Sequence, residues 1–375
     1  MNKKLRPLLK WTGGKFDEFP LFSEHIPTFE RYIEPFFGGG GVFFALQPQV
    51  PALINDKSTD LINFYNQITD LDFKKELFLY TDAWDDLGDL VFFLWRNSAA
   101  DFINYIQKTK DIAVLKEGLQ QQLDIFLTHK STLTNGDFIV NFELFKAMLL
   151  TSIVDKAKRI KIISSKGSNC FTKEELCSHF ETGLRGGAYL FFRRLLNMHY
   201  NDQVYLSPAK AAANWYFVRE FCYGAMFRFN AKGEFNIPYG GITYNKKKFR
   251  EKVERLFTKQ VAKLFKQTNL SNDDFESFLN DAQLTTGDFI FIDPPYDTEF
   301  SEYDQSAFNH NDQERLASLL KDTPAKWMIV IKETPFIRQL YTGSGINILT
   351  FFKNYSYNVR GRNNREVIHL IITNY

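Results

Sequence analysis

Short apolar runs alternate with stretches of helical spacing near both ends of the chain. The runs that we expect to be buried strands are Tyr32–Phe37, Ala52–Ile54, Phe289–Ile292, Trp327–Ile331 and Val367–Ile372. Apolar residues recur at helical intervals after several of these runs, at Val42–Leu46, Leu61–Ile68 and Leu316–Leu320. Because short buried strands that alternate with helices are typical of doubly wound proteins, the pattern predicts an α/β fold with a mostly parallel sheet.

The middle of the chain has a different pattern. Apolar positions recur at helical spacing, for example at Phe102–Gln107 and Phe142–Ile153, and polar links separate the helices that they predict. A chain of 375 residues is long enough for two domains, or for one domain with a large insertion. We therefore expect residues 1–80 and 215–375 to form one α/β domain, and residues 81–214 to be a mainly helical insertion.

Composition narrows the class of protein. Hydrophobic residues make up 44% of the chain and charged residues 24%, which is typical of globular proteins. No stretch approaches the roughly 18 apolar residues of a membrane helix, and the basic start runs into Thr12–Lys15 instead of an apolar signal core. We expect a cytoplasmic protein with no membrane partner. Cys170, Cys177 and His179 match no common zinc spacing, so we expect no metal.

The net charge of +2 says little about partners, because local patches decide whether a protein binds nucleic acid. Basic residues gather at Lys156–Lys166, at Lys246–Lys266, and at Arg360, Arg362 and Arg365. Each cluster taken alone is best interpreted as a solvated face. The clusters gain meaning only if other parts of the chain indicate DNA binding.

A run of glycines follows the first predicted strand. Gly38–Gly41 stands between that strand and a helix, where glycines let backbone approach a ligand and the helix offers N–H donors. The run lacks both the dinucleotide spacing and the Gly-Lys-Ser/Thr of a phosphate loop. Asp56 ends the next predicted strand, about 20 residues downstream, where α/β nucleotide sites hold ribose hydroxyls. The pattern favours a cofactor that has a ribose but no phosphate; the alternative is a tight turn without a ligand.

A second unusual segment, Asp293-Pro294-Pro295-Tyr296, closes another apolar run. The two prolines fix φ and remove two N–H groups, which leaves rigid carbonyl acceptors beside a carboxylate. Such acceptors and a flat tyrosine ring suit a planar base that carries an NH2 group. When that nitrogen attacks a methyl group it gains positive charge, and fixed acceptors stabilise the charged state more than the ground state. The alternative is a proline-stiffened turn with no chemistry.

Taken together, the motifs resemble those of the Dam-like adenine-specific DNA methyltransferases. The segments that carry the resemblance are Leu9–Lys15 (LKWTGGK), Glu34–Gly40 (EPFFGGG), Asn55-Asp56, the hairpin Arg228–Gly240 (RFNAKGEFNIPYG) and Asp293–Tyr296 (DPPY). They occur in the family's order, with the cofactor motifs before the catalytic one. The resemblance covers roughly residues 5–80 and 185–375 and leaves the rest of the middle unmatched.

The resemblance implies a Rossmann-like sheet, mixed but mostly parallel, with helices on both faces and an inserted helical DNA-recognition region. It implies a site-specific enzyme that transfers a methyl group from S-adenosylmethionine to N6 of an adenine flipped out of duplex DNA. The implied catalytic residues are Asp293, Pro294, Pro295 and Tyr296. The implied cofactor-binding residues are Trp11, Lys15, Glu34, Phe37, Gly38, Gly40, Asp56 and Asp293. The implied DNA-binding residues are Arg228, Asn230, Asn236, Arg360 and Arg362.

One position departs from the family pattern, and alternatives stay open. Lys332-Glu333 stands where the family has a Ser-Asn pair after the penultimate strand. A cytosine-N4 methyltransferase would use the same chemistry, but its family more often has serine at the position of Asp293. An RNA target and a non-catalytic DNA-binding subunit are further alternatives. A restriction endonuclease system is a candidate partner, and the target sequence does not follow from the motifs.

Overall fold

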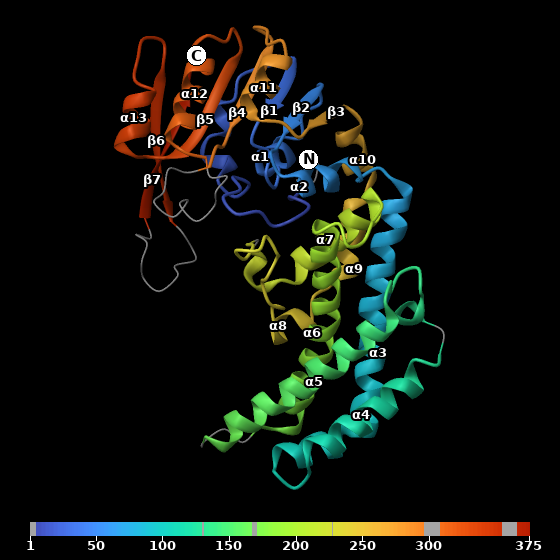
Figure 1. Ribbon diagram of the computed structural model, residues 1–375. Coiled ribbons are helices and arrows are strands. Elements are labelled where there is room, and N and C mark those ends of the chain that lie inside the picture. The colour runs from blue at the N-terminus through green and yellow to red at the C-terminus, as the bar shows by residue number, and fades with distance from the viewer. Residues whose placement is uncertain (1–4, 130, 167–170, 227, 296–307, 355–365) are drawn as a thin grey trace. The chain divides into compact units, whose positions relative to one another are not determined.

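The chain folds into two compact units (Figure 1). The computed structural model describes residues 5–129, 131–166, 171–226, 228–295, 308–354 and 366–375. Unit 1 is formed by Met1–Asn66 and Thr258–Tyr375, and unit 2 by Gln67–Phe257. Unit 2 is therefore inserted into the chain of unit 1. None of the helices among the described residues is both long enough and apolar enough to cross a membrane.

In the described part of unit 1, seven strands form one sheet in the order β3-β2-β1-β4-β5-β7-β6. Their bounds are β1 Arg31–Glu34, β2 Ala52–Asn55, β3 Thr268–Ser271, β4 Asp288–Ile292, β5 Lys326–Lys332, β6 Asn347–Asn354 and β7 Glu366–Thr373. Strands β1 to β5 pair in parallel, whereas β7 is antiparallel to both β5 and β6. The predicted mixed, mostly parallel sheet is confirmed.

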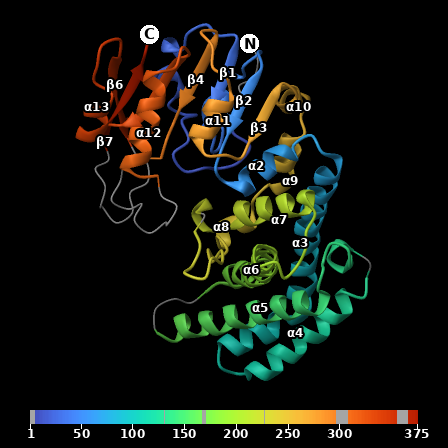
Figure 2. The same ribbon diagram turned by 45° about the horizontal axis from the view of Figure 1, so that its top comes forward.

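Helices cover both faces of this sheet, as predicted (Figures 1 and 2). The helices of unit 1 are α1 Gly41–Leu46, α2 Thr59–Asn66, α10 Lys259–Lys266, α11 Phe275–Asp281, α12 His310–Lys321 and α13 Pro335–Leu340. On one face, Ile290 and Ile292 of β4 join a buried core with α11, α12 and α13. Because side chains alternate along a strand, the neighbouring residues face the other way. There Tyr32 packs near Phe43 of α1, with ring centroids 6.1 Å apart.

The central strands β1 and β4 are tied together at their amino ends. Arg31 of β1 donates to both carboxylate oxygens of Asp288 in β4, at 2.7 Å from Nε and 2.6 Å from Nη2. A two-pronged bond of this kind fixes orientation as well as distance. The opposite, carboxyl ends of β1 and β4 are therefore held next to each other.

Two strands of the sheet, β3 and β6, have no counterpart among the predicted runs. Each lies at an edge of the sheet. The sequence of β3 is Thr-Asn-Leu-Ser, and only its first residue is buried. In β6 the side chains of Leu349 and Phe352 are exposed. An edge strand has less need of apolar residues than a central one, so hydrophobicity alone does not reveal it.

Unit 2 is helical in its described residues apart from turns and isolated bridges. Its helices are α3 Leu71–Ile106, α4 Ile112–Phe126, α5 Phe142–Ser165, α6 Lys173–Tyr200, α7 Pro208–Phe221, α8 Ile242–Asn245 and α9 Phe249–Leu256. Helices α5 and α6 approach closely, since a Cβ on Gly187 would lie 2.8 Å from Leu149 Cα. Residues 67–80 and 215–257, which the sequence pattern grouped with the α/β domain, lie in unit 2. Aromatic packing explains this, because Phe221 contacts both Trp84 and Phe249.

Candidate active site

The glycine loop after β1 is packed against the amino-terminal segment. Gly38 and Gly40 have φ values of 50° and 66°, which favour glycine. A Cβ on Gly38 would lie 2.8 Å from Cδ1 of Trp11, and one on Gly41 would lie 2.9 Å from the backbone nitrogen of Lys15. The glycines therefore leave room for Trp11 and Lys15 to approach the end of β1. Predicted cofactor residues from two motifs are brought together here.

Lys15 and Asp293 form an ion pair at the end of β4. Lys15 Nζ donates to Asp293 Oδ1 at 2.5 Å and to the carbonyl oxygen of Gly13 at 3.2 Å. The side chain of Lys15 is 1% exposed and that of Asp293 is 18% exposed. Burial raises the pKa of Asp293, and the Lys15 ammonium opposes this rise. The buried ammonium of Lys15 thus holds the carboxylate of Asp293, which keeps some access to solvent.

Glu34 adds a second carboxyl group at the end of β1. It is buried, and it accepts a hydrogen bond from the hydroxyl of Tyr32 at 2.8 Å. Burial raises the pKa of Glu34 well above its usual value, and the charges of Asp293 and Asp56 raise it further against the Tyr32 hydrogen bond. The three acidic groups therefore interact electrostatically at the carboxyl ends of β1, β2 and β4.

Asp56 is held by backbone donors. Its carboxylate accepts from the N–H of Gly38 at 2.8 Å and from the N–H of Ser58 at 2.9 Å. Burial raises the pKa of Asp56, and both backbone hydrogen bonds lower it. The neighbouring Asn55 makes different contacts, because its amide donates to the carbonyl oxygens of Pro35 and Asp273, at 3.1 and 3.0 Å. Asn55 thereby ties the loop after β1 to the loop after β3.

These groups lie where ligands bind in open α/β sheets. Strand β1 has β2 on one side and β4 on the other, so the chain changes direction across the sheet between β1 and β4. Ligands of doubly wound proteins bind outside the carboxyl ends of the strands at such a switch point. Phe37, a predicted cofactor residue, has a buried side chain, with its ring centroid 4.9 Å from that of Tyr65.

One buried polar residue near the proline motif was not predicted. Gln313, in the first turns of α12, is 1% exposed, and its Nε2 donates to the carbonyl oxygen of Pro295 at 3.2 Å. Its Oε1 is buried with no hydrogen-bond partner among the described residues. Pro294 is buried and Pro295 exposed, and Tyr296 lies outside the described residues. No local sequence signal separates Gln313 from a surface glutamine.

The predicted hairpin lies in unit 2 and is fixed to α6. Its backbone is bridged between Phe229 and Phe235. Asn197 of α6 both donates to and accepts from the backbone of Phe235, at 3.1 and 2.8 Å. Tyr189 donates to the carbonyl oxygen of Ile237 at 2.8 Å. The hairpin is therefore presented on a helix rather than left as a loose loop.

The predicted DNA-binding residues differ in their surroundings. Arg228 and Asn236 are exposed. Asn230 is half-buried, and its Oδ1 accepts from the backbone N–H groups of Lys232 and Glu234, so it shapes the turn. Arg360 and Arg362 lie outside the described residues.

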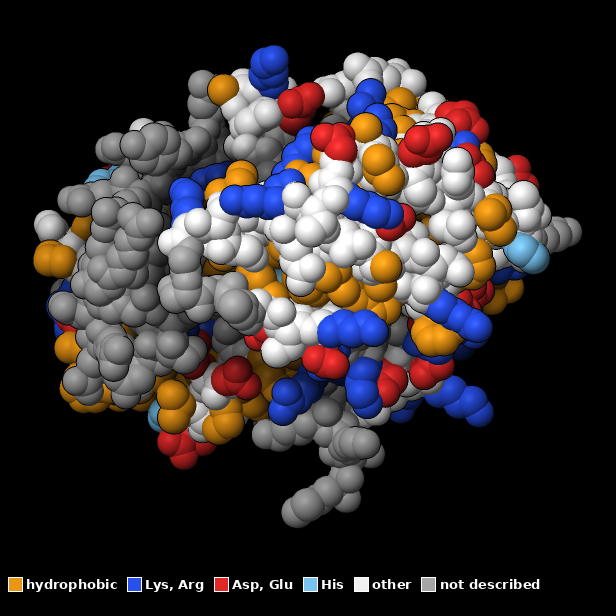
Figure 3. All heavy atoms as spheres, turned by 90° about the horizontal axis from the view of Figure 1, so that it is seen from below, with side chains coloured by type: hydrophobic (Ala, Val, Ile, Leu, Met, Phe, Trp, Pro, Cys, Tyr) orange, Lys and Arg blue, Asp and Glu red, His pale blue; other side chains and the backbone are white. Residues whose placement is uncertain are grey.

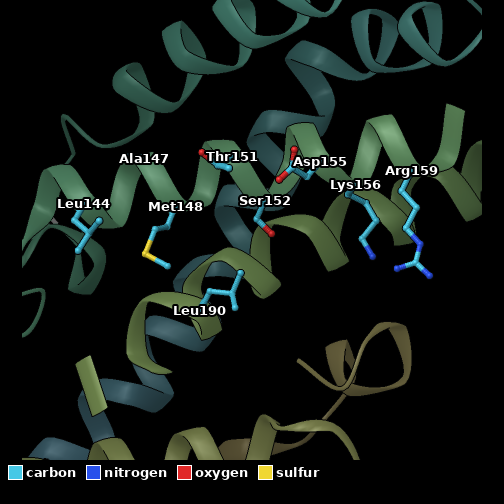
Figure 4. Close-up of a pocket in the computed structure, with 9 residues that line it drawn as sticks. All are labelled: Leu144, Ala147, Met148, Thr151, Ser152, Asp155, Lys156, Arg159 and Leu190. Atoms are coloured by element: carbon cyan, nitrogen blue, oxygen red, sulfur yellow. The ribbon is translucent and has the colours of Figure 1, made fainter. Parts of the chain in front are cut away.

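A separate hollow occurs within unit 2, between α5 and α6 (Figure 4). It is open to solvent and has a volume of about 500 Å³. Leu144 and Met148 line one end, and Lys156 and Arg159 extend from α5 at the other (Figure 4). On the face drawn in Figure 3, lysine and arginine side chains are interspersed with acidic and hydrophobic ones rather than gathered into one patch. The hollow contains none of the predicted site residues.

The mixed sheet, with acidic groups at the carboxyl ends of β1, β2 and β4, agrees with the α/β fold of methyltransferases. A family model described as the D12 class of N6 adenine-specific DNA methyltransferases matches residues 11–136 and 160–356. The chain belongs to this family. The match confirms the resemblance inferred from the motifs, and it selects adenine N6 over cytosine N4 and an enzyme over a non-catalytic subunit.

Relatives with established names agree with the family. The type II methyltransferase M.MjaIII of Methanocaldococcus jannaschii is 26% identical over 99% of this chain and 100% of its own length. The DNA adenine methylase of Vibrio cholerae is 23% identical over 99% of this chain and 97% of its own. The type II methyltransferase M.CviBI of Paramecium bursaria Chlorella virus NC1A is 32% identical over 168 residues. That match spans 44% of this chain and 61% of the viral protein.

Proposed function

We propose that this enzyme binds S-adenosylmethionine in the crevice at the ends of β1, β2 and β4 and methylates a flipped-out adenine at a specific site in duplex DNA. The observation that carries the proposal is the meeting of the Lys15–Asp293 ion pair with Glu34 and Asp56. These groups come from motifs far apart in the chain, and the fold brings them to one edge of the sheet.

The donors and acceptors of the crevice fit the cofactor. An ionised carboxylate has about four acceptor sites, and backbone N–H groups use one on each oxygen of Asp56. Asp56 thus retains acceptors for ribose hydroxyls, while Trp11, Gly38 and Gly40 shape the loop beside it. The sequence of the loop has no phosphate-binding device. When bound, S-adenosylmethionine supplies an electrophilic methyl group.

Asp293 is the residue that we assign to the reacting base. Its carboxylate and the carbonyl oxygen of Pro294 accept hydrogen bonds from the adenine amino group and stabilise the positive charge that develops on N6. The Lys15 ammonium favours the ionised form of this carboxylate. Tyr296 stacks on the base, which contributes about 1–3 kcal/mol. That stacking offsets part of the cost of flipping, a few kcal/mol. Gln313 holds the peptide carbonyl of Pro295 in place.

We assign recognition of the DNA to unit 2 and to the basic residues that follow β6. Arg228 is exposed on an anchored hairpin, and arginine is the usual partner of guanine in the major groove. Asn236 lies exposed on the same hairpin, and Asn230 supports its turn. Arg360 and Arg362 contact the DNA backbone. The similarity to type II methyltransferases supports a restriction-modification system as the context, and we propose that the enzyme acts in the cytoplasm.

The test is transfer of a labelled methyl group from S-adenosylmethionine to unmodified duplex DNA, followed by nucleoside analysis. We expect the label in N6-methyladenine for the wild-type protein and none for Asp293→Asn. The matched control is Asp281→Asn, which changes an exposed carboxylate of α11. Label transfer by Asp293→Asn at the wild-type rate would overturn the assignment of Asp293. If the protein did not bind S-adenosylmethionine in a titration, the assignment of this cofactor would be overturned.

A further inference from the structure

A second ion pair lies on the same amino-terminal segment as Lys15. Glu18 lies shortly after Lys15, in a turn of the chain. Its Oε1 accepts a hydrogen bond from Lys353 Nζ in β6. The side chain of Glu18 is 11% exposed and that of Lys353 is 15% exposed. Charges are almost never buried to this degree unless they are paired. Neither residue belongs to a motif that the sequence analysis singled out.

The segment that carries both pairs is fixed on the sheet. Phe22, shortly after Glu18, stacks on Phe291 of β4, with ring centroids 5.7 Å apart and planes 13° apart. Asp293 follows the same strand. Lys15 and Glu18 are thus presented by one short stretch of chain that is packed on the strand leading into Asp293. The Glu18–Lys353 pair adds a link from this stretch to β6.

The charges of Glu18 and Lys353 influence Asp293 electrostatically. After burial and Lys15, the next influences on the pKa of Asp293 are Glu18, which raises it, and Lys353, which lowers it. The two influences oppose each other because the pair is formed by opposite charges. Removal of one partner alone would therefore leave an uncompensated charge close to the catalytic carboxylate.

Other charged groups of the described residues also lie near Asp293 and Glu18. Lys15 contacts it directly, and Glu34 interacts with it from β1. His369 of β7 lies with Nδ1 3.6 Å from Glu18 Oε2. Burial, together with the charges of Lys15, Lys353 and Lys332, lowers the pKa of His369 to about 3. The imidazole is therefore neutral at the pH of the reaction.

We propose that Glu18 and Lys353 act as a pair of positioning residues for methyl transfer: they hold the Lys15 segment against β6 and balance the charge around Asp293. The proposal rests on the proposed function, in which an ionised Asp293 accepts a hydrogen bond from the adenine amino group. The pair acts through Asp293 and Lys15 and does not itself touch the substrate.

The balance predicts opposite effects for the two partners. Glu18→Gln removes an anion and leaves the Lys353 cation, which favours ionised Asp293, so the acid limb of the pH–rate profile moves to lower pH. Lys353→Met leaves the Glu18 anion, so the limb moves to higher pH. The double variant removes both charges and restores the wild-type position. We expect displacements of a few tenths of a unit to about one pH unit.

The experiment measures kcat and kcat/KM of the full-length enzyme on duplex DNA from about pH 5 to pH 9, where general acid–base groups titrate. Glu18→Asp and Lys353→Arg keep the charges and should keep the wild-type limb. Glu24→Gln is the matched control, because Glu24 lies on the same segment with a side chain that is 81% exposed. Melting temperatures identify the variants that remain folded. One folded single variant is enough to test the predicted direction in which the acid limb moves.

The proposal would be overturned if the acid limbs of both single variants moved in the same direction. It would also be overturned if each variant lost rate equally at every pH. Asp293→Asn separates this result from a failure of the proposed function. If Asp293→Asn retains activity, the assignment of Asp293 is wrong. If Asp293→Asn is inactive and the acid limbs do not move in opposite directions, only the role of the Glu18–Lys353 pair is wrong.

Discussion

Lys15 and Asp293 lie in contact although they come from opposite ends of the sequence, with Lys15 Nζ 2.5 Å from Asp293 Oδ1. The contact joins the amino-terminal motif to the proline motif and makes them parts of one site. It also explains how a lysine can be almost completely buried, since a buried cation needs a paired anion. The Lys15 ammonium in turn opposes the rise in the pKa of Asp293 that burial causes.

Lys15→Met should leave Asp293 without its cation. Because burial already raises the pKa of Asp293 and Lys15 opposes this rise, the variant should need a higher pH for activity. We expect a fall in kcat at neutral pH and an acid limb displaced upward by about 1–3 units. The measurement is the pH–rate profile, with Lys321→Met as a control at an exposed lysine of α12. An unchanged acid limb would argue against the role of the ion pair.

Glu34→Gln should change how stability depends on pH. Burial raises the pKa of Glu34 above its ordinary 4.5. A carboxyl group with a raised pKa stabilises the fold below its unfolded pKa, and this contribution is lost as the pH rises through the folded pKa. Glutamine does not ionise, so the variant does not lose stability in this way as the pH rises. The stability of the variant relative to wild type should therefore increase above pH 4.5, by at most about 1.4 kcal/mol for each pH unit.

The check on Glu34 is the free energy of unfolding by denaturant at a series of pH values. Glu30→Gln is not a suitable control, because Glu30 packs against Gly287. Asp281→Asn changes an exposed carboxylate instead and should show a flat difference from wild type. A flat difference for Glu34→Gln as well would mean that the pKa of Glu34 is not raised in the folded protein.

Gln313→Leu should loosen the proline motif without affecting the binding of the cofactor. The lost hydrogen bond to the Pro295 carbonyl is of a kind that contributes about 0.5–1.5 kcal/mol, so kcat should fall by roughly two- to tenfold. Asn311→Leu alters an exposed amide on the same helix and is the matched control. Single-turnover rates and the affinity for S-adenosylmethionine separate the two effects. A weaker affinity with an unchanged rate would contradict this role.

Arg228→Ala should relax the choice of target sequence. Loss of an arginine that reads guanine removes about 1–3 kcal/mol of discrimination at one base pair. Lys232→Ala, at an exposed lysine of the same hairpin, should weaken binding to all sequences alike. Methylation of a library of duplexes that differ at single positions distinguishes these outcomes. If the sequence preference of Arg228→Ala matches that of wild type, Arg228 does not read a base.

The central strands could be predicted from the sequence because their middle residues are buried on both faces and are therefore apolar. The residues of β4, from Asp288 to Ile292, are all buried, and the predicted run Phe289–Ile292 covers all of them except Asp288. Ends of strands that carry glycine or proline were equally informative, since glycine permits a positive φ and proline fixes φ. The edge strands β3 and β6 carry too few buried residues to be seen in this way.

Polar residues that depend on tertiary contacts were beyond prediction. Gln313, Glu18 and Lys353 look like surface residues in the sequence, and only the folded chain shows that each is buried with a partner. Lys15 and Asp293 could be predicted through their motifs, but their direct contact could not. The packing of Phe37 on Tyr65 could not be predicted from its motif either.

The insertion of unit 2 between β2 and β3 has a consequence for how the protein folds. Strands β1 and β4 are neighbours in the sheet, yet the whole of Gln67–Phe257 is synthesised between them. Parallel pairing over so long a separation is slow, since a large loop must close before any contact rewards it. A unit that folds early brings its own two ends to fixed positions and shortens that search. Because the rings of Phe73 and Phe257, near the two ends of unit 2, lie with centroids 5.9 Å apart, a folded unit 2 shortens the loop that must close before β1 and β4 pair.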